Sequence, residues 1–170
     1  MRPSSDEAAE RTGEGSARVR EFVALNRRRL RGDSQGAVER ARWAELRDQL
    51  AVALGAVLPG VGPRRRTLRV RTHLKVLVTT NLAQELLHAH ELGECGLFLR
   101  CERPPAPGTP LQLELQDRAG RSLELEGSVA WARREPDGRG PAGMGVVLHA
   151  LSDWDRMRLA GLVEAELDAL

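Results

Sequence analysis

Five arginines lie within residues 64–71, and an alternating apolar pattern follows them directly. Guanidinium groups match phosphate oxygens and also the paired acceptors O6 and N7 on the guanine edge. Arg65 and Arg69 are four residues apart with Arg66 between them, so this arm can grip a nucleotide if a rigid strand follows. The simpler alternative is a solvated basic segment in an arginine-rich chain, because the sequence contains a single lysine, Lys75.

Two glycine-containing segments could form a surface beside this arm. Gly93 and Gly96 stand at the entrance to a predicted strand, where glycine lets a backbone turn sharply or approach a ligand closely. Gly143 and Gly145 lie in a later segment and could serve a strand bulge or a ligand wall. For this later pair the spacing favours a structural role.

Composition excludes several classes of protein. With 170 residues and 41% hydrophobic residues, the chain suits one domain plus an appendage, or two small domains. A formal charge of +2 is not the signature of a general nucleic-acid binder. No run approaches the roughly 20 apolar residues of a membrane span, so we expect a cytoplasmic protein. Two cysteines without CxxC spacing and four scattered histidines predict no metal site. No serine stands in a catalytic pattern, and we expect neither an enzyme nor a cofactor.

The N-terminal third is predicted to be helical. Residues 1–16 are polar and without periodicity, which predicts a disordered tail. Apolar residues then recur at helical spacing over residues 17–31 and 37–54, which predicts a helical hairpin within residues 17–57. Residues 58–63 are rich in proline and glycine and predict a linker.

Beyond the linker the hydrophobic period changes from 3.6 to 2. Alternation over residues 68–78 predicts one long strand, and residues 81–90 suggest a short helical turn. Further alternation ends at Trp131, which the pattern places on the core face. Ser152 can cap a final helix. The remaining predicted strands are residues 97–101, 111–115, 123–131 and 144–150. Short strands joined by tight turns favour an antiparallel sheet that closes into a small barrel over residues 64–170.

These segments, in this order and spacing, resemble the PilZ domain family over residues 63–164. The RxxxR motif of the family matches Arg65 to Arg69, and its [DN]xSxxG motif corresponds to residues 91–96. The glycine-rich strand at residues 143–146, followed by a helix, matches the end of the domain.

The resemblance implies a six-stranded antiparallel β-barrel and binding of the bacterial dinucleotide cyclic-di-GMP. In such domains the arginine arm grips guanine edges and phosphates, and the second motif supplies polar contacts from the barrel surface. The ligand-binding residues that the resemblance implies are Arg65, Arg66, Arg69, Glu91, Gly93 and Gly96.

Two positions depart from the family pattern. Glu91 stands where the motif has aspartate or asparagine, and Gly93 stands where it has serine. A missing hydrogen bond to a charged ligand costs about 1.5–3 kcal/mol, which is about ten- to hundredfold in affinity. The sequence therefore predicts weakened nucleotide binding.

Two hypotheses remain open. The first is a non-catalytic receptor or adaptor in cyclic-di-GMP signalling. The second is a ligand-independent scaffold that binds a protein partner through the helical hairpin or a barrel face. Direct nucleic-acid binding by the arginine clusters is less favoured, because no aromatic platform accompanies either cluster.

Overall fold

The computed structural model describes residues 5–54, 67–138 and 140–168, with side chains from Gly15 onward. It divides into two compact units, residues 1–68 with 164–170 and residues 69–163. The predicted linker at 58–63 and the arginines Arg64, Arg65 and Arg66 fall outside the described residues.

The first unit contains an antiparallel helical hairpin of α1 (Ser5–Leu30) and α2 (Ala37–Ala53). Phe22 stacks on Trp43, with ring centroids 6.2 Å apart, and the buried Asn26 accepts a hydrogen bond from the Trp43 indole at 2.9 Å. An ion pair between Arg42 and Glu21, at 2.7 Å, joins the two helices on the exposed side. The hairpin was predicted, and the pairing explains why each helix has only one apolar face.

One boundary of this unit differs from the prediction. The helix α1 begins at Ser5, so residues 5–16 are helical and the predicted disordered tail is wrong for them. Alanine and glutamate favour helix even where apolar periodicity is absent. The residues from Glu164 onward also group with the first unit, and Glu164 accepts hydrogen bonds from Arg27 at 2.6 and 3.1 Å. The boundary between the two compact units therefore lies between Val163 and Glu164 at the C-terminal end.

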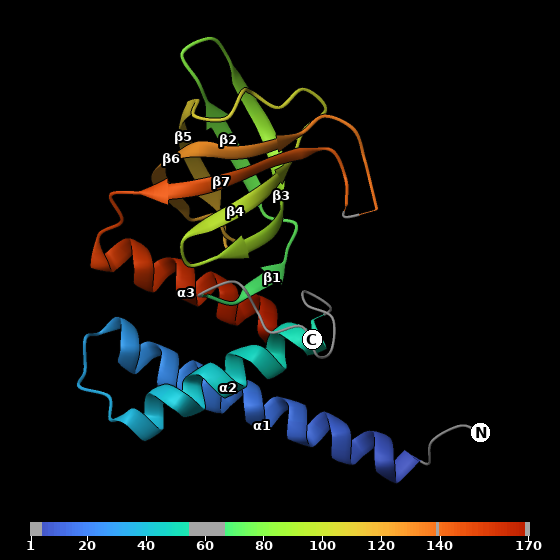
Figure 1. The fold of residues 1–170 in the computed structure, drawn as a ribbon, viewed down its shortest axis with the longest axis vertical. Coiled ribbons are helices and arrows are strands. Elements are labelled where there is room, and N and C mark those ends of the chain that lie inside the picture. Colours follow the sequence, from blue (N-terminus) through green and yellow to red (C-terminus); the bar gives the residue numbers. More distant parts are fainter. Residues whose placement is uncertain (1–4, 55–66, 139, 169–170) are drawn as a thin grey trace. The chain divides into compact units, whose positions relative to one another are not determined.

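The second unit is a closed antiparallel β-barrel (Figure 1). Six strands close in the order β3-β2-β5-β6-β7-β4, and β4 returns to pair with β3. A short seventh strand, β1, pairs with the C-terminal end of β3, beyond the residues that pair with β2. The strands are β1 (Arg69–Arg71), β2 (Lys75–Thr79), β3 (Gln84–Gly93), β4 (Gly96–Arg100), β5 (Pro110–Gln116), β6 (Ser122–Arg133) and β7 (Gly143–His149).

The interior of the barrel is filled by alternating apolar residues of these strands, as the period of 2 predicts. Removing each such side chain from water contributes about 1.5–3 kcal/mol before conformational entropy is counted. After β7, helix α3 (Asp153–Leu167) is capped by Ser152, whose hydroxyl accepts the backbone N–H of Asp155 and donates to its carboxylate. The buried interior residues include Val76, Val78, Leu92, Leu97, Leu99, Leu113, Leu115, Leu125, Val129, Met144 and Val146.

Two predicted elements of the barrel are wrong. Residues 81–90 are not a helical turn: a tight turn at Thr80 leads into β3, whose residues 84–88 pair with β2. The single strand predicted at 68–78 is broken between β1 and β2. There the backbone N–H of the buried Thr72 donates a hydrogen bond to the carbonyl of His90. The hydroxyl of Thr72 accepts a hydrogen bond from the backbone N–H of Leu74.

Candidate functional site

The outer surface over β1, β3 and β4 brings together the described residues of the predicted site. In the register of β1 and β3, Arg69 lies opposite Gly93 and Arg71 lies opposite Glu91. In the β3–β4 hairpin, Gly93 lies opposite Gly96. Directly opposed residues of antiparallel strands point to the same face. Arginine, glutamate and the two glycines therefore share one outer surface, as the motifs predicted.

The two glycines leave a strip of bare backbone that the side chain of Arg69 crosses. A Cβ atom placed on Gly96 would lie 3.6 Å from the Nη2 atom of Arg69. The same atom would lie only 2.4 Å from the carbonyl oxygen of Val146 on β7. The absence of a side chain at Gly96 therefore has two effects. It lets β7 approach β4 closely, and it leaves room for the guanidinium of Arg69 above the backbone of β4.

We expect the Gly96→Ala variant to be destabilised by about 1–3 kcal/mol, because the carbonyl of Val146 belongs to the backbone and cannot move without disturbing the sheet. Thermal unfolding measures the effect. The matched control is Gly161→Ala on helix α3, where an added Cβ meets nothing within 4 Å and helix propensity favours alanine. Equal unfolding temperatures for the two variants would contradict this account of Gly96.

Glu91 stands beside the guanidinium of Arg69. Their closest charged atoms, Nη1 and Oε2, are 3.8 Å apart, and the side chains are 24% and 33% exposed. An anionic ligand that approaches Arg69 would therefore also meet the carboxylate of Glu91. A carboxylate can accept the N–H groups of a guanine edge, but it repels phosphate at the same distance.

An aromatic pair lies next to this surface and was not predicted. Along one row of the sheet, Phe98 lies opposite Glu91 and Gly145, and Gly145 lies opposite Trp131. The rings of Phe98 and Trp131 stack with centroids 5.3 Å apart and planes 14° apart. Trp131 is 39% exposed, so part of its ring can meet a ligand.

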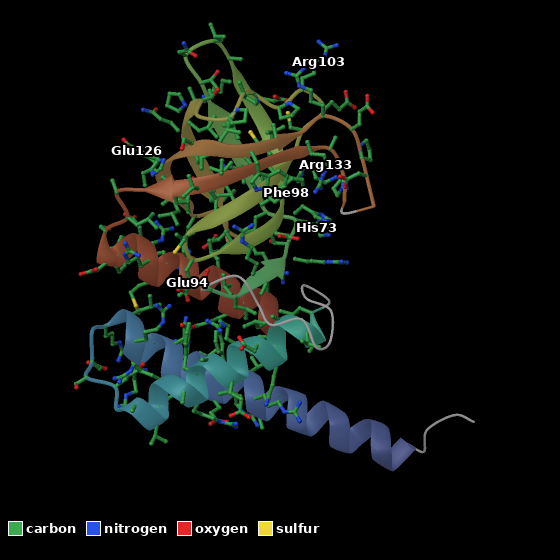
Figure 2. The ribbon with its side chains drawn as sticks, in the orientation of Figure 1. His73, Glu94, Phe98, Arg103, Glu126 and Arg133 are labelled. Atoms are coloured by element: carbon green, nitrogen blue, oxygen red, sulfur yellow. The ribbon has the colours of Figure 1, made fainter. Side chains whose placement is uncertain are left out.

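The guanidinium of Arg133 lies near both rings of this aromatic pair. Its carbon atom lies 5.2 Å from the centroid of the Trp131 ring and 6.0 Å from that of Phe98. The guanidinium also pairs with Asp137 at 3.2 Å and donates to the carbonyl of Pro141 at 3.2 Å. Figure 2 shows Phe98 and Arg133 close together on this side of the barrel.

Two β-bulges place the functional side chains outward. The register shifts by one residue between Ala89 and Glu91 in β3, and again between Val129 and Trp131 in β6. A bulge inserts one residue and reverses which face the following side chains occupy. The prediction that Trp131 lies on the core face is therefore wrong, because strict alternation was carried past the second bulge.

His90 is the extra residue of the first bulge, and its ring meets Phe98 edge-on with centroids 6.1 Å apart. Its Nδ1 atom is buried and has no hydrogen-bond partner among the described residues. Burial lowers the pKa of His90 below its ordinary value of 6.5, against the opposing charge of Glu91 and with the help of Arg100 and Arg71. The neutral ring is therefore the form that this position favours.

We expect the ring of His90 to titrate by NMR with a midpoint below 6.5. Because the folded state binds this proton less readily than the unfolded chain, the stability that the neutral ring contributes is present above about pH 6.5. It is lost as the pH falls through and below that value. The His90→Asn variant should therefore lose less stability than the native protein on acidification. A midpoint above 6.5 would contradict the burial of the ring.

This surface combines cations, a carboxylate, bare backbone and an aromatic face, which are the groups that bind a nucleotide. Among the described residues, no three histidine, cysteine, aspartate or glutamate side chains are placed to hold a metal ion. The structure places four of the six predicted site residues together, namely Arg69, Glu91, Gly93 and Gly96. Arg65 and Arg66 lie outside the described residues.

The fold and the surface define a small β-barrel with a candidate binding face on its outer wall. The sequence model of the PilZ domain family matches residues 63–165, so the chain belongs to this family. Among curated proteins, none matches the chain.

The solved structures that share the fold include the following two. The Bacillus subtilis inhibitor of motility (MotI/DgrA) is 16% identical, with a TM-score of 0.53 over 64% of this chain and 53% of that one. This chain therefore spans about half the length of that protein. The PilZ domain with c-di-GMP of YcgR from Escherichia coli is 14% identical, with a TM-score of 0.50 over 63% of this chain and 94% of that one. At these identities the likeness concerns the fold.

Proposed function

We propose that this chain is a non-catalytic regulator of the cyclic-di-GMP type, whose barrel binds the dinucleotide weakly through its outer wall. The observation that carries the proposal is the position of Arg69 over the bare backbone of Gly96, beside Gly93 and Glu91. The family assignment and the ligand named for the YcgR domain support it.

Each group has a chemical role in this proposal. The guanidinium of Arg69 donates to a phosphate or to O6 and N7 of a guanine, and Arg65 and Arg66 add the same chemistry from the preceding segment. Glu91 accepts N–H groups of the guanine edge. The exposed part of Trp131 offers a face on which a base can stack, a contact worth about 1–3 kcal/mol per base.

Weak binding follows from two features of the same surface. Gly93 offers no side-chain donor to the ligand, and the carboxylate of Glu91 competes with phosphate for Arg69. As a sensor of a bacterial signalling nucleotide, the protein would work in the cytoplasm. Among the described residues, no helix is both long and apolar enough to cross a membrane.

Isothermal titration calorimetry with cyclic-di-GMP tests the proposal, with cyclic-di-AMP as the control ligand of equal charge. The proposal expects measurable, salt-sensitive binding of the guanine ligand and weaker binding of the adenine ligand, which lacks O6. Equal affinities for both would show attraction to phosphate alone and would contradict a guanine site.

The alternative is a scaffold that binds a protein partner and no nucleotide. The observation that favours it is the pairing of Glu91 with Arg69, which already gives the arginine an anionic neighbour. If the Glu91→Asn/Gly93→Ser protein also binds no cyclic-di-GMP, the result would favour the scaffold.

A further inference from the structure

A second outer face of the barrel, over β3, β2, β5 and β6, has a row in which apolar and acidic side chains lie on separate halves. The strand registers align one residue from each strand in a single row across this face. In order, the row is Leu86, Leu77, Glu114 and Glu124. Two apolar side chains therefore lie on one half of the row and two carboxylates on the other half.

On one side of this row lies a row with His88, Lys75, Gln116 and Ser122, so a cation borders its apolar half. The row on the other side is polar throughout. It runs from Gln84 and Thr79 through Gln112 to Glu126, and ends at His149 on β7. In Figure 2, Glu126 lies on the side of the barrel away from Phe98 and Arg133. This face is thus separate from the proposed nucleotide site.

A groove of about 530 Å³ follows the acidic half of the face. Carboxylates of Glu114, Glu124 and Glu126 line it, together with Asp155 from the first turn of α3. Neither lysine nor arginine is among the described residues that line the groove, so no lining side chain carries a permanent positive charge. The groove therefore favours a cationic occupant.

Two features of this face favour an occupant. Glu114 and Glu124 lie directly opposite each other on adjacent strands, and like charges so placed are destabilising by about 0.2–1 kcal/mol. The hydroxyl of Ser122 donates to Glu114 but does not remove the charge repulsion. On the apolar side, Leu86 is 56% exposed and Leu82, at the tip of the β2–β3 turn, is 90% exposed. A partner with cations opposite the carboxylates and apolar groups opposite the leucines would relieve both.

We propose that this face docks a basic amphipathic helix of a partner protein. Leu77 and Leu86 would receive the apolar stripe of the helix, and Glu114, Glu124 and Glu126 would pair with its arginines or lysines. Three strand spacings separate β3 from β6, which is about 14 Å and accommodates a helix of about 10–12 Å in diameter. Charge complementarity selects a basic helix over an acidic or neutral one.

The chain's own basic amphipathic helix does not suit this role. The apolar face of α1 is occupied within the hairpin, where Phe22 is 1% exposed and Asn26 is 3% exposed. A second copy of this chain would have to open its hairpin before it could dock. The proposal therefore commits to a separate protein and does not depend on nucleotide binding.

The test uses the full chain and a synthetic helical peptide of leucine and arginine, with leucines at positions i, i+3, i+4 and i+7. A scrambled peptide of the same composition is the peptide control. Binding is measured by fluorescence anisotropy for the native protein, for Glu114→Gln/Glu124→Gln and for Leu86→Ser. The matched protein control is Glu102→Gln/Glu135→Gln, which removes the same charge from exposed residues outside the groove.

We expect the amphipathic peptide to bind the native protein at least about tenfold more tightly than the scrambled peptide. Affinity should fall about tenfold in Glu114→Gln/Glu124→Gln and also fall in Leu86→Ser, but not in the control variant. The glutamine variant should unfold at an equal or higher temperature than the native protein, because like-charge repulsion is removed. Equal binding of both peptides, or equal losses in the two double variants, would overturn the proposal. Self-association of the native protein that is lost only in Glu114→Gln/Glu124→Gln would identify a second copy as the occupant and would also overturn it.

Discussion

Replacing Glu91 by asparagine and Gly93 by serine is expected to raise the affinity for cyclic-di-GMP by about ten- to hundredfold. Serine restores a hydroxyl that can donate to the ligand, and one hydrogen bond to a charged group is worth about 1.5–3 kcal/mol. Asparagine removes the carboxylate that lies 3.8 Å from the guanidinium of Arg69. Both replaced residues lie on the outer face, in the part of β3 that pairs with β1 and β4.

Calorimetry on the native and the Glu91→Asn/Gly93→Ser proteins measures this gain. The matched control is Glu102→Asn/Gly161→Ser, which makes the same two replacements away from the site; an added Cβ at Gly161 meets nothing within 4 Å. The control should leave the affinity unchanged. A native protein that already binds tightly, with no gain on repair, would show that the two departures do not limit binding.

Removing the guanidinium of Arg69 is expected to have the opposite effect and to be at least as large. In the Glu91→Asn/Gly93→Ser background, Arg69→Ala should lower the affinity about hundredfold, because charge-assisted hydrogen bonds to phosphate or guanine are lost together. The Glu91→Asn/Gly93→Ser background is used because its higher affinity allows a hundredfold loss to be measured. Calorimetry and the dependence of affinity on salt concentration are the measurements.

The control for this loss is Arg121→Ala in the same background. Arg121 pairs with Asp117 in the turn between β5 and β6, at 2.7 Å, and its side chain is 77% exposed. Its removal takes away the same charge at another place on the barrel. Similar losses in the two variants would indicate general charge attraction and would contradict a specific role for Arg69.

The barrel could be predicted because its interior follows a simple rule. Residues such as Leu113, Leu115, Val146 and Leu148 alternate with exposed ones, and all four are buried as the period of 2 requires. The same rule failed at Trp131, because a bulge adds a residue to β6 and moves the ring outward. A bulge depends on pairing with the neighbouring strand, and no local pattern in the sequence announced it.

The candidate site was predictable only in part. Arg69, Glu91, Gly93 and Gly96 were found from motif positions, and the strand registers bring them together. The stack of Phe98 on Trp131 was not found, because its partners come from β4 and β6, which are neighbours of β7 and not of each other. Glycine at position 145 makes room for that ring, since a Cβ there would lie 2.2 Å from the Trp131 indole nitrogen.

Titration of isotopically labelled protein with cyclic-di-GMP, followed by NMR of the backbone amides, tests the central claim most directly. The account predicts that the largest shifts occur at Arg69, Glu91, Gly93 and Gly96, together with the indole N–H of Trp131. It predicts no comparable shift at Glu114 or Glu124 on the separate acidic face. Shifts centred on that face, or no shift in the repaired Glu91→Asn/Gly93→Ser protein, would contradict a nucleotide site on the outer wall over β1, β3 and β4.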